Sequence, residues 1–357
     1  MTGLLNRGDH VTDTLVVDRR LGEGAFAEVY RVRHAHLGPQ ALKIFKRVAS
    51  VEGTKALLGE AQLLSTLGHP NIIRVFDANT VRTPEGMRGY FTMEYIPGGN
   101  LEQLIREHRP AVPTEIVITV LEQIAEGLAI AHDQTPPVLH RDVTLANILV
   151  GREDTGPRVR ISDFGLAKRA DPVTRLAAAQ GTYAFMAPEV LRNEDYSCAG
   201  DVWSVGTIAY LLLTNRFPFD DDGPFPWFSR TGFSRGPLPP SSYNPEVDAE
   251  LDRLVLAALE TDQRDRPATA RVLADALRER RAAAGDDRTP VSHAEPATTV
   301  PPCERARRLA EAAIALSRVP GELAHAADLM EEAIDIASAY RRLHQFRIEL
   351  WRRGVTL

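Results

Sequence analysis

The chain has 357 residues, 44% of them hydrophobic and 25% charged, a composition typical of a soluble globular protein of about two domains. A net charge of −6 and an isoelectric point near 6.0 argue against a general nucleic-acid-binding protein, because neutralising phosphates requires a basic surface. Two cysteines are too few for a disulfide framework, and neither a secretion signal nor an apolar run of the ~18 residues that a membrane span needs is present, so we expect a cytoplasmic protein.

The first part of the chain has the pattern of β structure. Residues 14–33 form two extended runs around a glycine-containing turn, and residues 39–48 add a third run. A stripe of apolar residues at helical spacing follows in residues 51–67. Strand-like runs return in residues 69–81 and 87–96. We therefore expect a small, β-rich lobe with one helix.

The next part of the chain is helical. Residues 101–105 and 115–132 are apolar at helical spacing, directly after the turn sequence PGGN. Residues 249–285 contain two further helical patterns, which are broken near Pro267. The sequence thus predicts a larger, helical lobe after the β-rich one.

The last part of the chain differs from both lobes. Residues 282–302 are rich in Pro, Thr, Ala and charge and lack periodicity, which indicates a linker. Residues 303–353 are again apolar at helical spacing and are interrupted at Pro320 and Gly321, so we expect a C-terminal α-helical hairpin. One such pair cannot bury its own apolar face. It would pack on the rest of the chain as a stabilising appendage, or bind a protein partner or a second copy.

Several short motifs carry the chemistry. In chain order they are LGEGAFAEVY (21–30), ALKIF (41–45), HRDVTLANIL (140–149), SDFGLA (162–167), GTYAFMAPEV (181–190) and DVWSVG (201–206). Together, and in this order, they resemble the protein kinase family, specifically its bacterial Ser/Thr members. The resemblance covers residues 12–281 and implies an α+β bilobal fold, with an N-lobe in residues 12–96 and a C-lobe in residues 97–281.

The resemblance implies that the first lobe and the hinge bind ATP. Gly22 and Gly24 would let backbone amides approach the phosphates without an intervening Cβ, although the family's third glycine is Ala27 here. Lys43 would neutralise the α- and β-phosphates and would be held by Glu60. The remaining cofactor-binding candidates would surround the adenine: the backbones of Glu94 and Ile96 in the hinge, and the side chains of Leu21, Val29, Ala41 and Leu149.

The resemblance also assigns the catalytic groups. Asp142 would accept or orient the proton of the attacking hydroxyl, while Asn147 and Asp163 would hold Mg²⁺ through oxygen ligands. Thr182, in a segment like that of Ser/Thr kinases, would reach towards Asp142. ATP and Mg²⁺ are therefore the implied cofactors, and protein Ser/Thr hydroxyls the implied acceptors. Thr174 is the candidate autophosphorylation site, and activation without phosphorylation is the alternative.

Besides Ala27, two residues near the catalytic Asp depart from the family pattern. Ser/Thr kinases carry Lys two residues after the catalytic Asp and Pro next, whereas this chain has Thr144 and Leu145. Loss of one charge-assisted contact to the γ-phosphate removes about 1.5–3 kcal/mol of transition-state stabilisation, which slows the reaction ~10- to ~150-fold. Because every group needed to bind Mg–ATP remains, we expect a slower but active enzyme. The alternative is a nucleotide-binding pseudokinase adaptor acting through its C-terminal helices; a small-molecule kinase is disfavoured by GTYAFMAPE and DVWSVG.

The resemblance implies roles for four further residues. Glu189 and Arg266 would form an ion pair that ties the substrate loop to the lower helices, and Asp201 would hold the catalytic loop from below. Arg141 would bind a phosphorylated residue of the activation loop.

Overall fold

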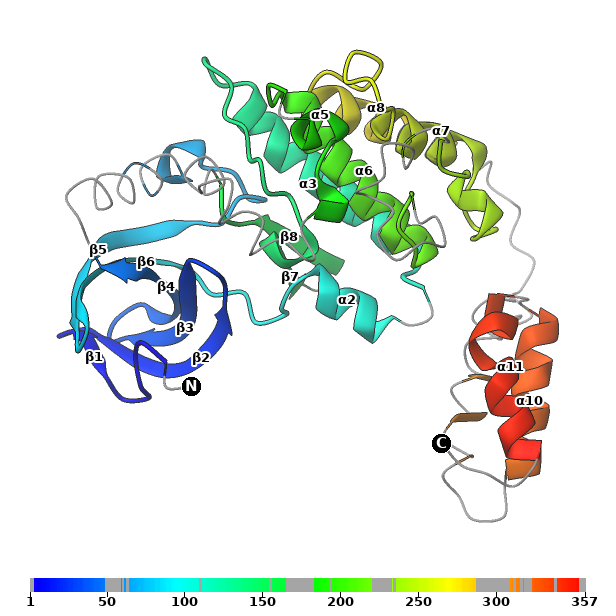
Figure 1. Ribbon diagram of the computed structural model, residues 1–357, viewed down its shortest axis with the longest axis horizontal. Coiled ribbons are helices and arrows are strands. Elements are labelled where there is room, and N and C mark those ends of the chain that lie inside the picture. Colours follow the sequence, from blue (N-terminus) through cyan, green and yellow to red (C-terminus); the bar gives the residue numbers. More distant parts are fainter. Residues whose placement is uncertain are drawn as a thin grey trace. The chain divides into compact units, whose positions relative to one another are not determined.

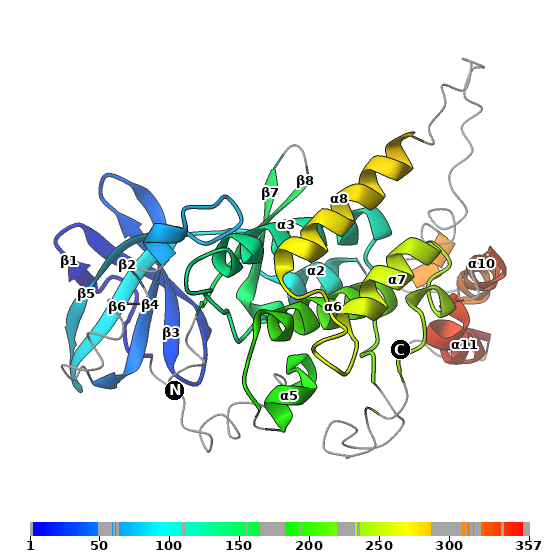
Figure 2. The same ribbon diagram turned by 90° about the horizontal axis from the view of Figure 1, so that it is seen from above.

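The protein is described by a computed structural model. It describes residues 3–48, 59, 61, 64–108, 111–153, 156–164, 183–192, 194–219, 233, 236–286, 309–310, 313–314, 317, 323–336 and 339–352. The chain divides into two compact units, Met1–Ala283 and Ala284–Leu357. The first unit contains a β-rich lobe and a helical lobe, which lie side by side (Figures 1 and 2).

The β-rich lobe is one antiparallel sheet. Its strands are ordered β1 (His10–Thr12), β2 (Leu15–Glu23), β3 (Ala27–His34), β4 (Gly38–Val48), β6 (Gly86–Glu94) and β5 (Val75–Thr83). The extended runs predicted from the sequence are confirmed, whereas the short first strand was not predicted. Of the predicted helix in residues 51–67, the described residues 59, 61 and 64–67 are helical, and the rest lies outside the described part.

The two faces of this sheet have different environments because side chains alternate along a strand. On β4, Leu42 and Ile44 point into a separate apolar cluster, which we call the N-lobe core. Ala41 on the same strand belongs to the main cluster shared with the helical lobe. The buried members of the N-lobe core are Leu5, Leu15, Val17, Tyr30, Val32, Leu42, Ile44, Val81 and Tyr90. The face that carries Ala41 and Lys43 is therefore the one turned to the helical lobe.

A glycine turn leads from the sheet into the helical lobe. A Cβ on Gly98 would lie 2.0 Å from the carbonyl oxygen of Val150, so no side chain fits there. Gly99 has φ +87°, a conformation that glycine adopts without strain. Its carbonyl accepts a hydrogen bond from Val150 N at 2.9 Å, on the small sheet of β7 (Ile148–Glu153) and β8 (Gly156–Ile161). The turn thereby fixes β7 against the end of the hinge.

The helical lobe is built around two buried helices, α3 (Thr114–His132) and α6 (Cys198–Thr214). Residues 199–213 of α6 are all buried, which is why its sequence lacks a polar face. The shorter elements are α2 (Leu101–Glu107), η1 (Leu145–Asn147), η3 (Tyr183–Phe185), α5 (Pro188–Leu191), η5 (Pro240–Ser242), α7 (Ala249–Ala258) and α8 (Ala270–Asp286). The predicted break near Pro267 falls between α7 and α8 and is confirmed.

The second unit contains α10 (Leu323–Ile336) and α11 (Ala339–Arg352), which pack against each other. Their buried side chains include Met330 and Trp351. The sequence predicted an interruption at Pro320 and Gly321, and both α10 and α11 follow these residues. Residues 318–322 and 337–338 lie outside the described part, so the division of residues 303–353 into a helical hairpin stays a prediction. No helix in the described ranges is long and apolar enough to cross a membrane.

Candidate active site

Lys43 and Asp163, 120 residues apart in the chain, meet between the two lobes. Lys43 Nζ lies 2.6 Å from Asp163 Oδ1. The lysine is 4% exposed and lies 5.8 Å from the ring centroids of both Phe45 and Phe91. An ammonium in such surroundings requires an anionic partner, because burial of an unpaired charge is costly. Asp163 is that partner here, whereas the predicted holder, Glu60, lies outside the described residues.

Asp142 and Asn147 are brought together by the 3₁₀ turn η1. Asn147 Nδ2 donates hydrogen bonds to the backbone oxygen of Asp142 at 2.8 Å and to its Oδ2 at 2.9 Å. Burial raises the pKa of Asp142, against the charge of His140 and the hydrogen bond from Asn147, which lower it. The charges of Asp163 and Lys43 act on the same carboxyl in opposite directions. The amide of Ser162, which precedes Asp163, donates to the Asn147 carbonyl at 2.9 Å, so the segments of Asp142 and Asp163 lie next to each other.

The orientation of Asn147 bears on metal binding. Because its amide nitrogen faces Asp142, its amide oxygen is the atom left for a cation. Together with the Asp163 carboxylate it gives hard oxygen ligands of the kind that Mg²⁺ prefers. Among the residues that the structure describes, no group of three or more His, Cys, Asp or Glu could hold a metal on its own. The residues present fit an ion that is completed by phosphate oxygens and water.

The backbone around the site is held in an unusual conformation. Arg141 (φ 68°) and Asp163 (φ 66°) are non-glycine residues in the left-handed region, which is sparsely populated and clusters at functional sites. Phe164 is fully buried, with its ring 4.5 Å from that of His140. His140 Nε2 donates to Ser162 O at 2.9 Å, and its Nδ1 accepts from Asp142 N at 3.2 Å. His140 thus joins the two segments that carry the aspartates.

Asp201 holds the catalytic loop from below, as expected. Its fully buried carboxylate accepts from the amides of His140 and Arg141, both at 2.8 Å. It also accepts from His132 Nε2 at 3.0 Å and from the Tyr196 hydroxyl at 2.7 Å. Burial alone would raise the pKa of Asp201, but the hydrogen bond and charge of His132 bring it below its usual value. The carboxylate is therefore stabilised in its charged form.

His132 and Tyr196 were missed by the sequence analysis. His132 ends α3 and also accepts a hydrogen bond from the amide of Ala270, the first residue of α8, at 3.0 Å. Burial raises the pKa of Tyr196 well above its usual range, so its hydroxyl stays a donor. Neither residue stands in a short motif, and only their distance from Asp201 in the folded chain identifies them.

The residues predicted to surround the adenine come largely together. Ala41, Val29 and Leu149 belong to one apolar cluster with Ile96, whereas Leu21 is 40% exposed and lies outside that cluster. These residues come from β3, β4, β7 and the hinge, so both lobes contribute to the predicted set.

Glu94, the last residue of β6, uses its side chain in an ion pair and not for contact with the adenine. Its carboxylate pairs with Arg160 of β8, with nitrogen to oxygen distances of 3.1 and 3.3 Å. Its backbone amide donates to Arg74 O at 2.8 Å, so its carbonyl is the group left for a base.

The glycine-rich turn closes the hairpin of β2 and β3. A Cβ on Gly22 would meet no heavy atom within 4 Å, and one on Gly24 would make only an ordinary contact, so the fold itself does not require glycine there. The remaining reason for glycine at these positions is that a ligand can approach the backbone closely, which fits a phosphate group. Gly24 N donates to Ala27 O at 2.8 Å, so this amide serves the turn.

The two departures that follow the catalytic Asp, Thr144 and Leu145, lie at η1. Thr144 is 9% exposed, has an extended backbone and makes no side-chain capping bond to the turn that it precedes. Leu145 packs against the main apolar cluster. The threonine hydroxyl therefore has no evident structural task in capping η1.

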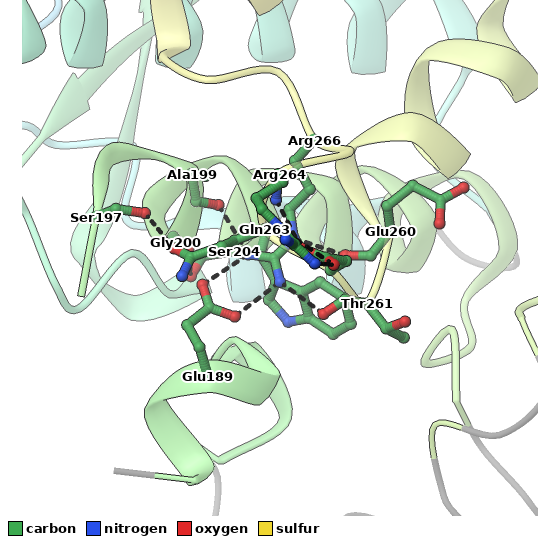
Figure 3. Close-up of polar contacts among 12 residues, drawn as sticks. Glu189, Ser197, Ala199, Gly200, Ser204, Glu260, Thr261, Gln263, Arg264 and Arg266 are labelled. Atoms are coloured by element: carbon green, nitrogen blue, oxygen red, sulfur yellow. Dashed lines mark hydrogen bonds and ion pairs between the residues drawn. The ribbon is translucent and has the colours of Figure 1, made fainter. Parts of the chain in front are cut away.

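The predicted ion pair of Glu189 with Arg266 is present (Figure 3). Arg266 donates to both carboxylate oxygens of Glu189 at 2.7 Å, and both side chains are buried. Arg266 also donates to three backbone carbonyls and lies 4.9 Å over the ring of Trp203. Of the other predicted residues, Thr174 and Thr182 lie outside the described part of the chain.

Known proteins that resemble this chain carry the family name that its motifs indicate. The family model described as "Protein kinase domain" matches residues 15–277. The chain is 31% identical to the serine/threonine-protein kinase PknB of Mycolicibacterium smegmatis over 307 residues, which are 83% of this chain and 48% of that protein. It is 35% identical to the serine/threonine-protein kinase Pkn1 of Myxococcus xanthus over 266 residues, 72% of this chain and 37% of that protein. It therefore spans less than half of the length of these curated relatives.

Among solved structures, the kinase domain of Mycobacterium tuberculosis PknI superposes with a TM-score of 0.56 at 26% identity. The match covers 77% of this chain and 99% of that domain.

Proposed function

The chain belongs to the protein kinase domain family, and from this premise we propose that it transfers the γ-phosphate of ATP to serine or threonine hydroxyls of protein substrates. The observation that carries the proposal is the meeting of Lys43, Asp142, Asn147 and Asp163 between the lobes. The names of the relatives, which are Ser/Thr kinases, support the choice of acceptor.

ATP would bind with its adenine against Val29, Ala41 and Leu149 and with its phosphates under the glycine-rich turn. Lys43 would exchange part of its contact with Asp163 for phosphate oxygens, since its ammonium carries three donors. Asp163 would then be free to hold Mg²⁺ together with Asn147. The bound ion would supply positive charge to the phosphate oxygens, which is the electrostatic part of catalysis.

Asp142 would orient the attacking hydroxyl and accept its proton. A buried carboxyl with a raised pKa is a better proton acceptor than an exposed one. The hydrogen bond from Asn147 fixes which carboxylate oxygen is occupied, so Oδ1 remains for the substrate. Thr182 would complete this side of the site.

The complete set of nucleotide-binding and catalytic groups argues against the adaptor alternative. Thr144 would make transfer slower by removing one contact to the γ-phosphate, without affecting the groups that bind Mg–ATP. We therefore keep an active kinase in bacterial signalling as the function.

The rest of the chain fits such a role. We place the kinase domain in residues 12–281, a linker in residues 282–302 and a helical segment for a partner or a second copy in residues 303–353. Thr174 stays a prediction for autophosphorylation.

The proposal is tested by transfer of labelled γ-phosphate from ATP to a generic Ser/Thr protein, with and without Mg²⁺. We expect transfer that requires Mg²⁺ and is lost in Lys43→Met. Arg264→Met is the matched control, because it removes one positive charge from an exposed pair with Asp262. Transfer that survives Lys43→Met, or incorporation only into small metabolites, contradicts the proposal.

A further inference from the structure

We propose that Glu28 is a positioning residue for the glycine-rich turn, and that the first residues of the chain hold it in place. We call residues 3–9 the N-terminal strap. The proposal rests on the nucleotide site proposed above, and it assigns a role to a segment that lies outside the predicted kinase domain.

The strap lies along β2 and β3, near the N-terminal end marked in Figure 1. Its Leu4 amide donates to Glu28 Oε2 at 2.9 Å, and its Leu5 amide donates to the Tyr30 hydroxyl at 3.1 Å. The Leu5 side chain is 8% exposed and belongs to the N-lobe core. Gly8 N donates to Val17 O at 2.9 Å, and β1 then pairs with β2. The strap is thus fastened at both of its ends.

Glu28 is the carboxylate to which the strap is attached. It is only 5% exposed, and the Tyr30 hydroxyl donates to the same oxygen as the Leu4 amide. Its other oxygen lies 3.3 Å from Arg20 NH2. A buried carboxylate without such partners would be strongly destabilising. Burial and the bond to Glu28 raise the pKa of Tyr30 to about 12, so the hydroxyl remains a donor.

A chain of ion pairs leads from Glu28 to the turn. Glu23 and Glu28 stand opposite each other in the register of β2 and β3, where like charges repel. Arg20 contacts both carboxylates and so bridges them, while Lys46 of β4 holds Glu23 from the other side. Gly24 follows Glu23 directly, and the turn begins there. The position of Glu28 therefore sets the position of both ends of the turn.

These contacts lie on the sheet face opposite to the nucleotide. Side chains alternate along β3, so Glu28 and Tyr30 point to the N-lobe core while Val29 points to the adenine site. The strap consequently positions the glycine-rich turn from the opposite face of the sheet, and it makes no contact with the adenine end of the site. Loss of the Glu28 charge should loosen the turn and weaken contacts to phosphates alone.

The test compares two ligands that differ in phosphates. Binding of Mg–ATP and of adenosine is measured by calorimetry on the full chain and on Glu28→Gln and Tyr30→Phe, with thermal unfolding to verify the fold. Tyr30→Phe keeps the ring in the N-lobe core and removes only the bridging hydroxyl. Asp18→Asn is the matched control, because it removes the charge of a separate ion pair with Arg31 on the same two strands.

We expect the dissociation constant for Mg–ATP to rise about tenfold in Glu28→Gln, the effect of one charge-assisted contact, and less in Tyr30→Phe. The constant for adenosine should not change, and Asp18→Asn should behave like the wild type. Equal losses for both ligands, or no loss for Mg–ATP, would overturn the role of Glu28 while leaving the nucleotide site intact. A wild type that binds neither ligand would contradict both proposals.

Discussion

The substitution Glu189→Gln should destabilise the helical lobe strongly, because it leaves Arg266 charged and buried without its anion. The Arg266 side chain has 0% exposure and the Glu189 side chain 2%, so water cannot replace the lost carboxylate. Gln keeps one acceptor, and three backbone carbonyls still face the guanidinium. We therefore take the lower end of the range for a broken buried pair, about 3 kcal/mol. For a domain of this size that corresponds to a fall in Tm of roughly 6–12 °C.

The assay is thermal unfolding, with Asp262→Asn as the matched control. That variant makes the same change of carboxylate to amide in the pair of Asp262 with Arg264, whose side chains are 39% and 85% exposed. Exposed pairs contribute little, so its Tm should stay near that of the wild type. The double variant Glu189→Leu with Arg266→Met should be more stable than either single one, since it leaves no unpaired charge. A fall in Glu189→Gln no larger than in Asp262→Asn would refute this reasoning.

Three further predictions concern the catalytic loop. Asp142→Asn should abolish transfer but raise Tm at pH 7. Burial raises the pKa of this carboxyl, so its ionised form destabilises the fold, and this loss of stability develops as the pH rises from the ordinary pKa to the raised one. The gain in Tm should therefore vanish in acid, which pH-dependent unfolding would show. Thr144→Lys should raise kcat by about tenfold or more, since the threonine makes no capping bond and the added ammonium can reach the γ-phosphate; an unchanged or lower kcat would contradict this. Tyr196→Phe should lower the free energy of unfolding by about 1 kcal/mol and slow transfer without changing ATP affinity, because Asp201 loses one of its hydrogen-bond donors. Denaturant titration measures the stability and kinetics measure the rate. Weaker ATP binding would contradict the assigned role.

The sequence predicted much of the site because its groups stand in short, ordered motifs. Lys43 and Asp163 were each assigned from their local segments, and their contact at 2.6 Å joins those assignments in space. The strands before residue 97 and the helices on both sides of Pro267 followed from periodicity and breakers. Glu60 and Thr182 lie outside the described residues, so their roles stay predictions.

The remaining features depend on contacts between distant residues. His132 lies 69 residues from Asp201, and Glu28 meets Leu4 across 24 residues, with no motif at either place. Residues 3–9 carry no periodicity because they bind largely through backbone amides, which any sequence supplies. The engagement of the Gly24 amide within its own turn was likewise invisible, since glycine spacing does not show which amides are free.

The most direct test of the central claim is phosphorylation of a Ser/Thr protein by the wild type and by Asp142→Asn at saturating Mg–ATP, with Asp133→Asn as a control on an exposed carboxyl. We expect phosphoserine or phosphothreonine with the wild type and the control, and none with Asp142→Asn even though it binds ATP as well as the wild type does. Transfer by Asp142→Asn at the wild-type rate, or a wild type that binds Mg–ATP and transfers nothing, would contradict the assignment of this site as a protein kinase active site.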